Sequence, residues 1–281
     1  MKFSKDTFRI AGAEFKTRNV LISLAVAFGC MALVIILEMI GVLTNLYGVL
    51  IGVAFVLALV FARKYCAYRD LNDELPYDLI LWIFPLSIIG ARLYYCIFEG
   101  SFDMFFDIAK GGLAIYGGII GGAIGLVLCC IIKKINPIKA MDVVAPVLIL
   151  GQAIGRIGCY SAGCCYGADV INKGMQWFPI AYHVHGGWHY ATFFWEFTLC
   201  VIGFFVLAWI LRRFKNTGLV TFSYLFYYGV VRYFTESFRD QSAQLFIGDQ
   251  PVSLWLSLIL VVLGTIGILT IVIKERIKDK N

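Results

Sequence analysis

The sequence predicts an all-α, polytopic membrane protein built as a helical bundle of about eight transmembrane helices. Hydrophobic residues make up 60% of the 281-residue chain and the mean hydropathy is +0.83, values that are typical of multi-span membrane proteins. Charged residues make up only 15% of the chain and cluster between the apolar runs. The net charge of +6 therefore belongs to the loops, and it does not indicate binding of nucleic acid.

Each apolar run is close to the ~20 residues that a helix needs to cross a bilayer. In chain order, the expected helices cover residues 19–43, 46–63, 77–99, 111–132, 141–163, 191–211, 218–236 and 251–273. The first run is too long for the apolar core of a signal peptide, and no small-residue cleavage site follows it. We therefore expect this run to be retained as a helix.

Basic residues lie in every second connection, which predicts how the helices are oriented. They are Lys2, Lys5, Arg9, Lys16 and Arg18; Arg63, Lys64 and Arg69; Lys133, Lys134 and Lys139; Arg212, Arg213 and Lys215; and Lys274, Arg276, Lys278 and Lys280. Because short cytoplasmic loops are enriched in Lys and Arg, the pattern predicts that both termini are cytoplasmic.

Polar side chains gather at the external ends of these predicted helices. They are Arg92, Arg156 and Arg232 in the outer halves of helices, and Tyr47, Tyr116, Glu196, Glu236 and Arg239 at outer helix ends. Charges inside a membrane are costly, and they normally face a bundle interior or a wet cavity that has a function. Because a guanidinium stays charged in a protein, several arginines at one depth indicate a site for an anionic group.

Some of these charges also have structural explanations. Arg92 lies near a helix end, so its side chain either contributes to the site or extends to the membrane interface. Arg232 and Glu236 are four residues apart on one helix face, so we expect them to pair, which is compatible with ligand binding. Asp142 opens the fifth predicted helix, where the helix dipole favours a carboxylate.

Glycines in the fourth predicted helix recur at the spacing that permits close helix packing. The pairs are Gly117/Gly121, Gly118/Gly122 and Gly121/Gly125. Small residues four apart let two membrane helices approach closely, so the pattern predicts a tight helix pair. A phosphate-binding loop is the alternative, but the lysine of a P-loop is missing from this pattern.

Three cysteines and three histidines cluster in and around the predicted external loop 164–190. Cys159, Cys164 and Cys165 lie at its start, where packing, a disulfide or a thiolate activated by Arg156 are the open alternatives. The histidines are His183, His185 and His189. Their spacing does not match a standard zinc site, so we expect no metal and favour an aromatic loop at the membrane surface.

Several segments resemble the bacterial prolipoprotein diacylglyceryl transferases. They are Gly111–Gly122, Asp142–Pro146, Gly151–Gly158 and Tyr228–Arg239, together with Tyr47-Gly48 and Gly90-Ala-Arg92. The resemblance covers residues 44–275 as a transferase-like membrane domain of seven helices. Residues 1–43 are then a cytoplasmic N-terminus with an extra transmembrane helix, and residues 276–281 are a cytoplasmic tail.

The resemblance implies an activity and a location. Members of this family transfer a diacylglyceryl group from phosphatidylglycerol to the lipobox cysteine thiol of an exported prolipoprotein, without a cofactor. The implied partners are phosphatidylglycerol, the prolipoprotein signal peptide with its lipobox, and the surrounding membrane lipids. The implied location is the bacterial cytoplasmic membrane, with the site facing the external side.

The resemblance also implies roles for individual residues. Arg156 and Arg232 would hold the lipid phosphate, Arg239 and Glu236 would support that site, and Tyr47 would line it. We expect Arg156, Arg232 and Tyr116 to be catalytic. The expected substrate-binding residues are Tyr47, Arg92, Gly155, Gly158, Cys159, Cys164, Gly167, Glu196, Glu236 and Arg239.

The chain departs from the family pattern after Arg156. Cys159, Ala162 and Cys164 stand where the family usually has Asn, Asn and Glu, whereas the final Gly167 is kept. Tyr116 replaces a frequent His, and Tyr190-Ala191 replaces a His-Pro pair. Two alternatives therefore accompany the transferase: a related membrane enzyme that uses Cys159, Cys164 or Cys165 with another acceptor, and a non-catalytic phospholipid-binding protein.

Overall fold

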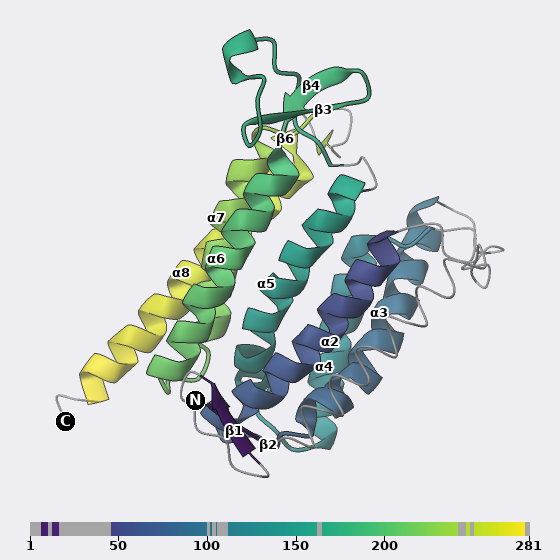
Figure 1. Ribbon diagram of the computed structural model, residues 1–281. Helices are drawn as coiled ribbons and strands as arrows, with labels where there is room; N and C mark the ends of the chain where they lie inside the picture. The colour runs from purple at the N-terminus through teal and green to yellow at the C-terminus, as the bar shows by residue number, and fades with distance from the viewer. Residues whose placement is uncertain are drawn as a thin grey trace. The chain divides into compact units, whose positions relative to one another are not determined.

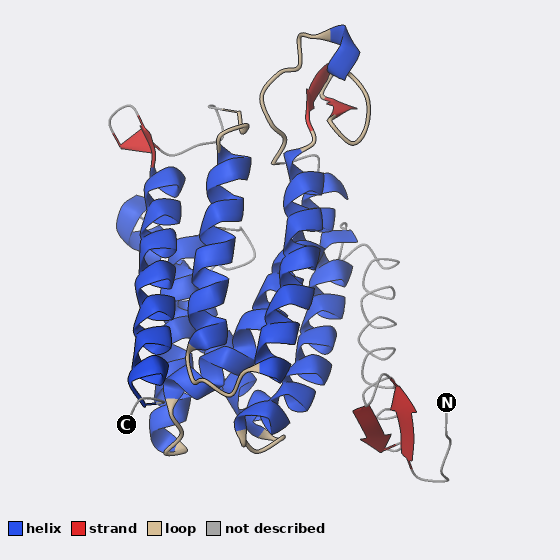
Figure 2. Cartoon of the chain, turned by 90° about the vertical axis from the view of Figure 1, so that its left-hand side faces the viewer, coloured by secondary structure: helices blue, strands red, loops and turns tan. Residues whose placement is uncertain are grey.

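The computed structural model consists mainly of long helices, and the strands among its described residues form short two-stranded hairpins (Figures 1 and 2). It describes residues 7–10, 13–16, 46–99, 102, 105, 112–161, 165–240, 246–247 and 250–278. The helices are α2 (Leu46–Cys66), α3 (Leu75–Glu99), α4 (Ile115–Ile132), α5 (Pro137–Ser161), α6 (Thr192–Arg213), α7 (Leu219–Glu236) and α8 (Val252–Lys278). The strands are β1 (Thr7–Ile10), β2 (Ala13–Lys16), β3 (Ala181–Val184), β4 (Gly187–Tyr190), β5 (Phe246–Ile247) and β6 (Gln250–Pro251), and the 3-10 turns are η1 (Ala67–Arg69) and η4 (Lys173–Met175).

Six of the described helices are long and apolar enough to cross a membrane, which confirms a polytopic helical membrane protein. These six are α2, α3, α4, α5, α6 and α8. Helix α7 is 18 residues long but is not among them, because tyrosines, Arg232 and Glu236 lower its hydropathy. The first predicted helix, residues 19–43, lies outside the described residues, so eight spans stay a prediction.

The chain divides into two compact units. The first unit comprises residues 1–60, 146–208 and 222–281, and the second comprises residues 61–145 and 209–221. The boundaries fall inside helices α2, α5, α6 and α7, so these helices contribute to both units. The candidate site described below lies within the first unit.

In the second unit, α3 and α4 pack closely along the predicted glycine face. A Cβ atom added at Gly117 would clash with the carbonyl oxygen of Gly90, and one added at Gly121 would clash with that of Leu86. At Gly125 the added atom would lie 2.7 Å from the carbonyl oxygen of Trp82. The predicted close helix packing is therefore confirmed, because only hydrogen fits at these positions.

The second unit also contains a buried ion pair, which corrects our interpretation of Asp142. Its carboxylate lies 3.0 Å from Nε of Arg69, and it accepts hydrogen bonds from Gly218 N at 2.8 Å and Thr221 N at 2.9 Å. Asp142 therefore caps the start of α7 rather than the start of its own helix. The four N-terminal N–H groups of a helix need such acceptors, and the dipole there favours an anion.

The segment before α6 is more ordered than the loop that we expected over residues 164–190. Strands β3 and β4 form an antiparallel hairpin in which His183 is paired with Trp188. Figure 1 shows this hairpin beyond the N-terminal end of α6. An isolated bridge also pairs Gly167 with Arg239. A Cβ atom at Gly167 would lie 2.6 Å from the carbonyl oxygen of Phe238, so the close approach requires glycine.

Candidate functional site

Three arginines and two glutamates from α5, α6, α7 and the residues after α7 form one cluster in the first unit. All five were expected site residues: Arg156, Glu196, Arg232, Glu236 and Arg239. Arg156 comes from α5, Glu196 from α6, and Arg232 and Glu236 from α7. Residues more than 80 positions apart in the chain thus form one charged site.

Glu196 joins two of the helices through its carboxylate. Its Oε1 atom lies 2.7 Å from Nη2 of Arg156, and its Oε2 atom lies 3.3 Å from Nη1 of Arg232. The Glu196 side chain is only 3% exposed, so water screens these contacts weakly. One carboxylate therefore fixes the positions of both guanidinium groups.

Glu236 connects Arg232 to the third arginine, Arg239, in the same way. Its Oε2 atom lies 2.6 Å from Nη2 of Arg232 and 3.5 Å from Nη1 of Arg239. The predicted pairing of Arg232 with Glu236 across one helical turn is confirmed. Arg232 thus lies between two carboxylates, which fix the orientation of its planar guanidinium.

Polar and aromatic contacts position the elements that carry the cluster. One turn before Arg156, Gln152 on α5 donates to the hydroxyl of Tyr224 on α7 at 2.9 Å. Beyond the end of α7, the ring of Phe238 packs against Trp195 and Tyr190 with centroids 5.4 and 5.6 Å apart. These contacts hold the segment that carries Arg239 against α6.

The two kinds of charge differ in exposure. The side chains of Arg156, Arg232 and Arg239 are each 18% exposed, whereas the carboxylates behind them are 2–3% exposed. The three cations and two anions leave one formal positive charge. An approaching anion therefore meets guanidinium groups first, and these groups form the strongest hydrogen bonds to phosphate oxygens.

A small cavity of about 10 Å³ lies among these side chains, with room for about one water molecule. It is lined by the five charged residues and by three further residues, Cys165, Thr192 and Thr235. An anion larger than water would therefore contact the cluster at the partly exposed guanidinium groups.

Thr192 and Thr235 were not among our expected site residues, and Cys165 was named only in the thiol-dependent alternative. The Sγ atom of Cys165 lies 3.5 Å from Nη2 of Arg239, and Thr192 Oγ1 donates to the carbonyl oxygen of Cys165 at 3.0 Å. Thr235 Oγ1 lies 3.4 Å from the carbonyl oxygen of Arg232. Thr235 immediately precedes Glu236, but no sequence pattern distinguished it from other threonines in apolar helices.

Two of the expected residues, Arg92 and Tyr116, belong to the second unit and have their own surroundings there. Arg92 is 2% exposed and donates to the carbonyl oxygens of Phe105 at 3.1 Å and Gly112 at 2.9 Å. Its guanidinium is thus held inside the protein and does not extend to the surface. The ring of Tyr116 lies 6.2 Å from that of Tyr94. Participation of Arg92 and Tyr116 in the site stays a prediction.

The remaining expected residues lie on α5, in the segment after it and at the start of α2. Gly155, Gly158 and the partly buried Cys159 are in α5, and Gly167 forms the bridge to Arg239. For Tyr47 only the backbone, in the first turn of α2, is described, and Cys164 lies outside the described residues. Among the described residues, no three His, Cys, Asp or Glu side chains are grouped as metal ligands.

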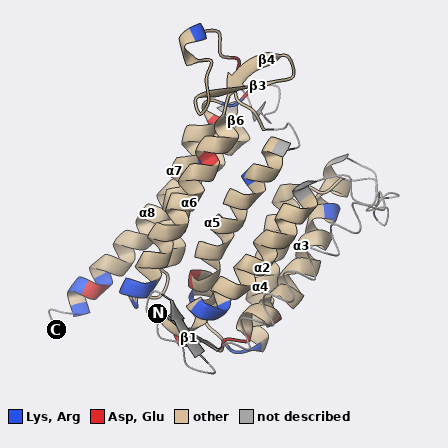
Figure 3. Ribbon diagram, in the orientation of Figure 1, with Lys and Arg blue, Asp and Glu red and all other residues tan. Residues whose placement is uncertain are grey.

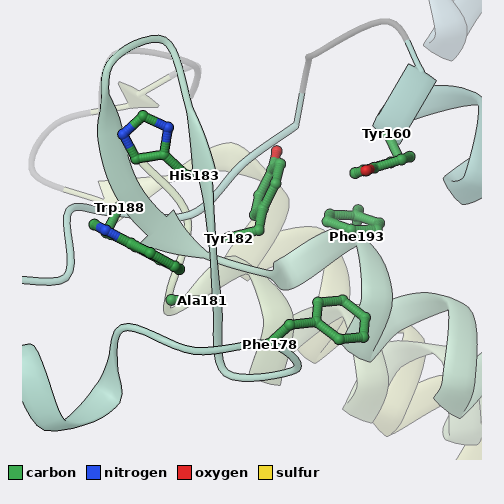
Figure 4. A pocket seen from close by; sticks show the side chains of 7 residues that line it. All are labelled: Tyr160, Phe178, Ala181, Tyr182, His183, Trp188 and Phe193. Atoms are coloured by element: carbon green, nitrogen blue, oxygen red, sulfur yellow. The ribbon is translucent and has the colours of Figure 1, made fainter.

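A second cavity of about 550 Å³ lies beside the β3–β4 hairpin in the same unit (Figure 4). It is lined by Tyr160, Phe178, Ala181, Tyr182, His183, Trp188 and Phe193. Figure 4 shows Tyr182 directed toward Tyr160 and Phe193, with His183 and Trp188 on the other side of the strand. We call this cavity the aromatic pocket.

Comparisons with known proteins agree with the resemblance found in the sequence. A family model described as prolipoprotein diacylglyceryl transferase matches residues 34–270. A protein of Listeria innocua named phosphatidylglycerol–prolipoprotein diacylglyceryl transferase is 38% identical over 243 residues, covering 83% of this chain and 86% of the relative. A relative from Clostridium perfringens, named phosphatidylglycerol–prolipoprotein diacylglyceryl transferase 1, is 32% identical over 247 residues, covering 84% of this chain and 93% of the relative. One from Streptococcus uberis is 36% identical over 234 residues, covering 79% and 89%.

Proposed function

We propose that this chain, which belongs to the prolipoprotein diacylglyceryl transferase family, transfers a diacylglyceryl group from phosphatidylglycerol to the lipobox cysteine of exported prolipoproteins. The single observation that carries the proposal is the cluster of Arg156, Arg232 and Arg239 with a net positive charge. The names of the relatives supply the two substrates.

The reaction explains why such a cluster is useful. The acceptor thiolate forms a sulfur–carbon bond to the phosphate-bearing carbon of the diacylated glycerol. The bond between that carbon and the phosphate ester oxygen breaks. Glycerol-1-phosphate leaves with that electron pair, so negative charge grows on the phosphate oxygens. Guanidinium groups that are already fixed by carboxylates stabilise this charge without reorganising during the reaction.

The geometry supports separate roles within the cluster. Arg156 and Arg232 would contact the phosphate, because both are partly exposed and share Glu196 as their positioning residue. Arg239, held by Glu236 and close to the thiol of Cys165, would complete the site on the side of the loop. Tyr47, Arg92, Tyr116, Gly155, Gly158, Cys159, Cys164 and Gly167 are proposed as further contacts to the substrates.

The multi-pass chain is proposed to lie in the bacterial plasma membrane with both termini cytoplasmic and the arginine cluster toward the external side. The last turns of α2, α6 and α8 each carry two basic residues, and Figure 3 shows the long middle stretches of these helices without charge. Basic residues favour the cytoplasmic side. The acceptor is exported, so an external site meets it where it emerges.

The experiment mixes the purified protein with phosphatidylglycerol and a synthetic lipobox peptide, and measures the diacylglyceryl thioether by mass spectrometry. We expect transfer by the wild type and a loss of about 10²- to 10³-fold in kcat/KM for Arg156→Ala, since removing one preorganised donor typically costs that much. The exposed Arg276→Ala on α8 is the matched control and should be as active as the wild type. Full activity of Arg156→Ala would remove the cluster from the mechanism.

A further inference from the structure

We propose that the β3–β4 hairpin holds the acceptor polypeptide as an added strand that pairs with the backbone of His183, the open part of the β3 edge, with apolar acceptor side chains in the aromatic pocket. This inference rests on the proposed function, and it identifies how the acceptor is held beside the arginine cluster. It follows from the hydrogen-bond pattern of the hairpin, the shape of the pocket and the distance along two helices.

The hydrogen-bond pattern leaves the backbone of His183 pointing away from β4. Tyr190 uses its N–H to donate to Ala168 and its carbonyl oxygen to accept from Gly167, at 3.1 and 2.9 Å. Tyr190 therefore does not exchange hydrogen bonds with its partner Ala181. Hydrogen-bonded and non-hydrogen-bonded residue pairs alternate along an antiparallel ladder. His183 lies two residues after Ala181, so its pair with Trp188 is also non-hydrogen-bonded, and the N–H and carbonyl of His183 point away from β4.

Within the described part of the chain, the β3 edge of this hairpin is open at His183 only, because Ala181 N already donates to the carbonyl oxygen of Trp177 at 2.9 Å. The outer edge of β4 is covered, because Val170 N donates to the carbonyl oxygen of Trp188 at 2.7 Å. On the β3 side, no described residue pairs with the N–H and carbonyl of the exposed His183. An open strand edge with unpaired backbone groups is a template for an extended peptide.

The aromatic pocket runs along this open edge. It touches Ala181, Tyr182 and His183, which are consecutive in β3. Side chains of consecutive strand residues point to opposite faces, so a cavity that contacts all three lies beside the strand rather than over one face. Figure 4 agrees, because Tyr182 and His183 project to different sides of the ribbon.

The pocket is one helical turn away from the arginine cluster along two helices. On α5, Tyr160 lines the pocket four residues after Arg156. On α6, Phe193 lines it three residues before Glu196, and the neighbouring Thr192 lines the charged cavity. One turn of helix rises about 5.4 Å, so a cysteine next to the docked segment can reach the cluster.

The chemistry of the pocket favours a polypeptide over a lipid acyl chain. An extended peptide supplies both a carbonyl and an N–H for His183, whereas an acyl chain supplies neither. The lining contains no Asp, Glu, Lys or Arg, so the docked segment is uncharged and apolar. A volume of about 550 Å³ is within the usual range for a binding pocket and accommodates several side chains.

The first test is amide hydrogen exchange with residue-level resolution on the wild-type protein in lipid nanodiscs. The probe is a lipobox peptide whose cysteine is replaced by serine, so that no transfer occurs. We expect the peptide to slow exchange at the outward amide of His183, with little change at the amide of Val184, which already bonds within the hairpin. Protection of His183 by phosphatidylglycerol alone would assign the pocket to lipid, and no protection by either would also overturn the proposal.

The second test compares two substitutions at one position by steady-state kinetics. His183→Ala removes the imidazole but keeps the N–H, whereas His183→Pro also removes the N–H, which proline permits at an edge strand. We expect the KM for the peptide to be about 2- to 10-fold higher for His183→Pro than for His183→Ala, which corresponds to one hydrogen bond. Their KM values for phosphatidylglycerol should be equal.

The exposed Ile171→Ala, in the same loop but outside the pocket, is the control and should match the wild type. Equal peptide KM values for the two His183 variants would contradict the added strand while leaving the transferase proposal intact. If the peptide protects the His183 amide of the wild type but no thioether forms, the transferase proposal is contradicted and the added strand is kept. The two proposals can therefore fail separately.

Discussion

Two buried arginine–carboxylate groups among the described residues are built from the same residue types but differ in whether their charged side chains can still contact a ligand. At Asp142, four donors from Arg69, Gly218 and Thr221 occupy the carboxylate, and both charged side chains are at most 1% exposed. At Glu196, the two arginine partners are each 18% exposed and line a small cavity. The first group has its charges matched one to one, whereas the second has an excess cation.

This difference separates an architectural ion pair from a binding site. A buried pair whose carboxylate accepts four hydrogen bonds fixes the backbone around it, and removing one partner leaves a costly unpaired charge. A cluster with surplus positive charge and partial exposure is instead completed by an anion. Substitutions in the two groups should therefore affect different observables, stability in one and catalysis in the other.

The largest effect is expected for Asp142→Ala, which leaves the buried Arg69 unpaired and the start of α7 uncapped. Removing one partner of a buried pair typically costs about 3–5 kcal/mol, so we expect a strongly lowered melting temperature and yield. Thermal unfolding followed by scanning fluorimetry in detergent measures this. The fraction that stays folded should keep a normal KM for phosphatidylglycerol, and a selective rise in that KM would contradict an architectural role.

A smaller effect, and one on catalysis, is expected for Glu196→Gln. The amide keeps the shape of the side chain but loses the charge that positions Arg156 and Arg232. A hydrogen bond to a charged group is worth about 1.5–3 kcal/mol, so kcat/KM should fall by roughly 10- to 100-fold. Thioether formation measures the rate, and the melting temperature should change far less than for Asp142→Ala. The comparison fails if Glu196→Gln mainly unfolds the protein.

Gly167→Ala should have a smaller effect that is confined to the hairpin side of the cluster. The added methyl group would lie 2.6 Å from both the carbonyl oxygen of Phe238 and the Cβ atom of Tyr190, so the bridge to Arg239 must shift. Overpacking of this kind costs about 1–3 kcal/mol. We expect faster amide exchange over β4 and residues 167–170, with a higher peptide KM, and unchanged exchange in that segment would argue against the bridge.

The smallest effect is expected for Cys165→Ser. The thiol contacts Arg239 at 3.5 Å, but a diacylglyceryl thioether on it would be a stable dead end and not an intermediate. Serine preserves a polar contact to the guanidinium, so we expect kcat/KM to change by less than about 3-fold, within 1 kcal/mol. A loss as large as that of Arg156→Ala, or a lipid adduct on Cys165 in intact-mass spectra, would favour the thiol-dependent alternative.

The sequence predicted best those features that depend on local spacing. The pairing of Arg232 with Glu236 follows from a four-residue separation, and the packing at Gly117 and Gly121 follows from the same separation of small residues. The polytopic helical class follows from composition and run length. Each of these signals lies within one helix, so no knowledge of other segments is needed.

Features that depend on distant partners could not be predicted in the same way. Asp142 was assigned to its own helix start, but its partners Gly218 and Thr221 lie 76 and 79 residues later. The hairpin around His183 was expected as a loop, because its two four-residue strands contain His, Gly and Trp rather than an alternating apolar pattern. Cys165 was noted as a thiol, but its contact to Arg239 depends on a bridge between separate segments.

The low hydropathy of α7 has a consequence for how the chain is made. This helix is less apolar than the six that are long and apolar enough to cross a membrane, because it carries Arg232 and Glu236 among several tyrosines. Helix α6, with Glu196, is synthesised before it, and the apolar α8 is synthesised directly after it. We therefore expect insertion of α7 to rely on α6, whose Glu196 supplies a carboxylate that pairs with Arg232, so that the same side chain serves both membrane insertion and the site.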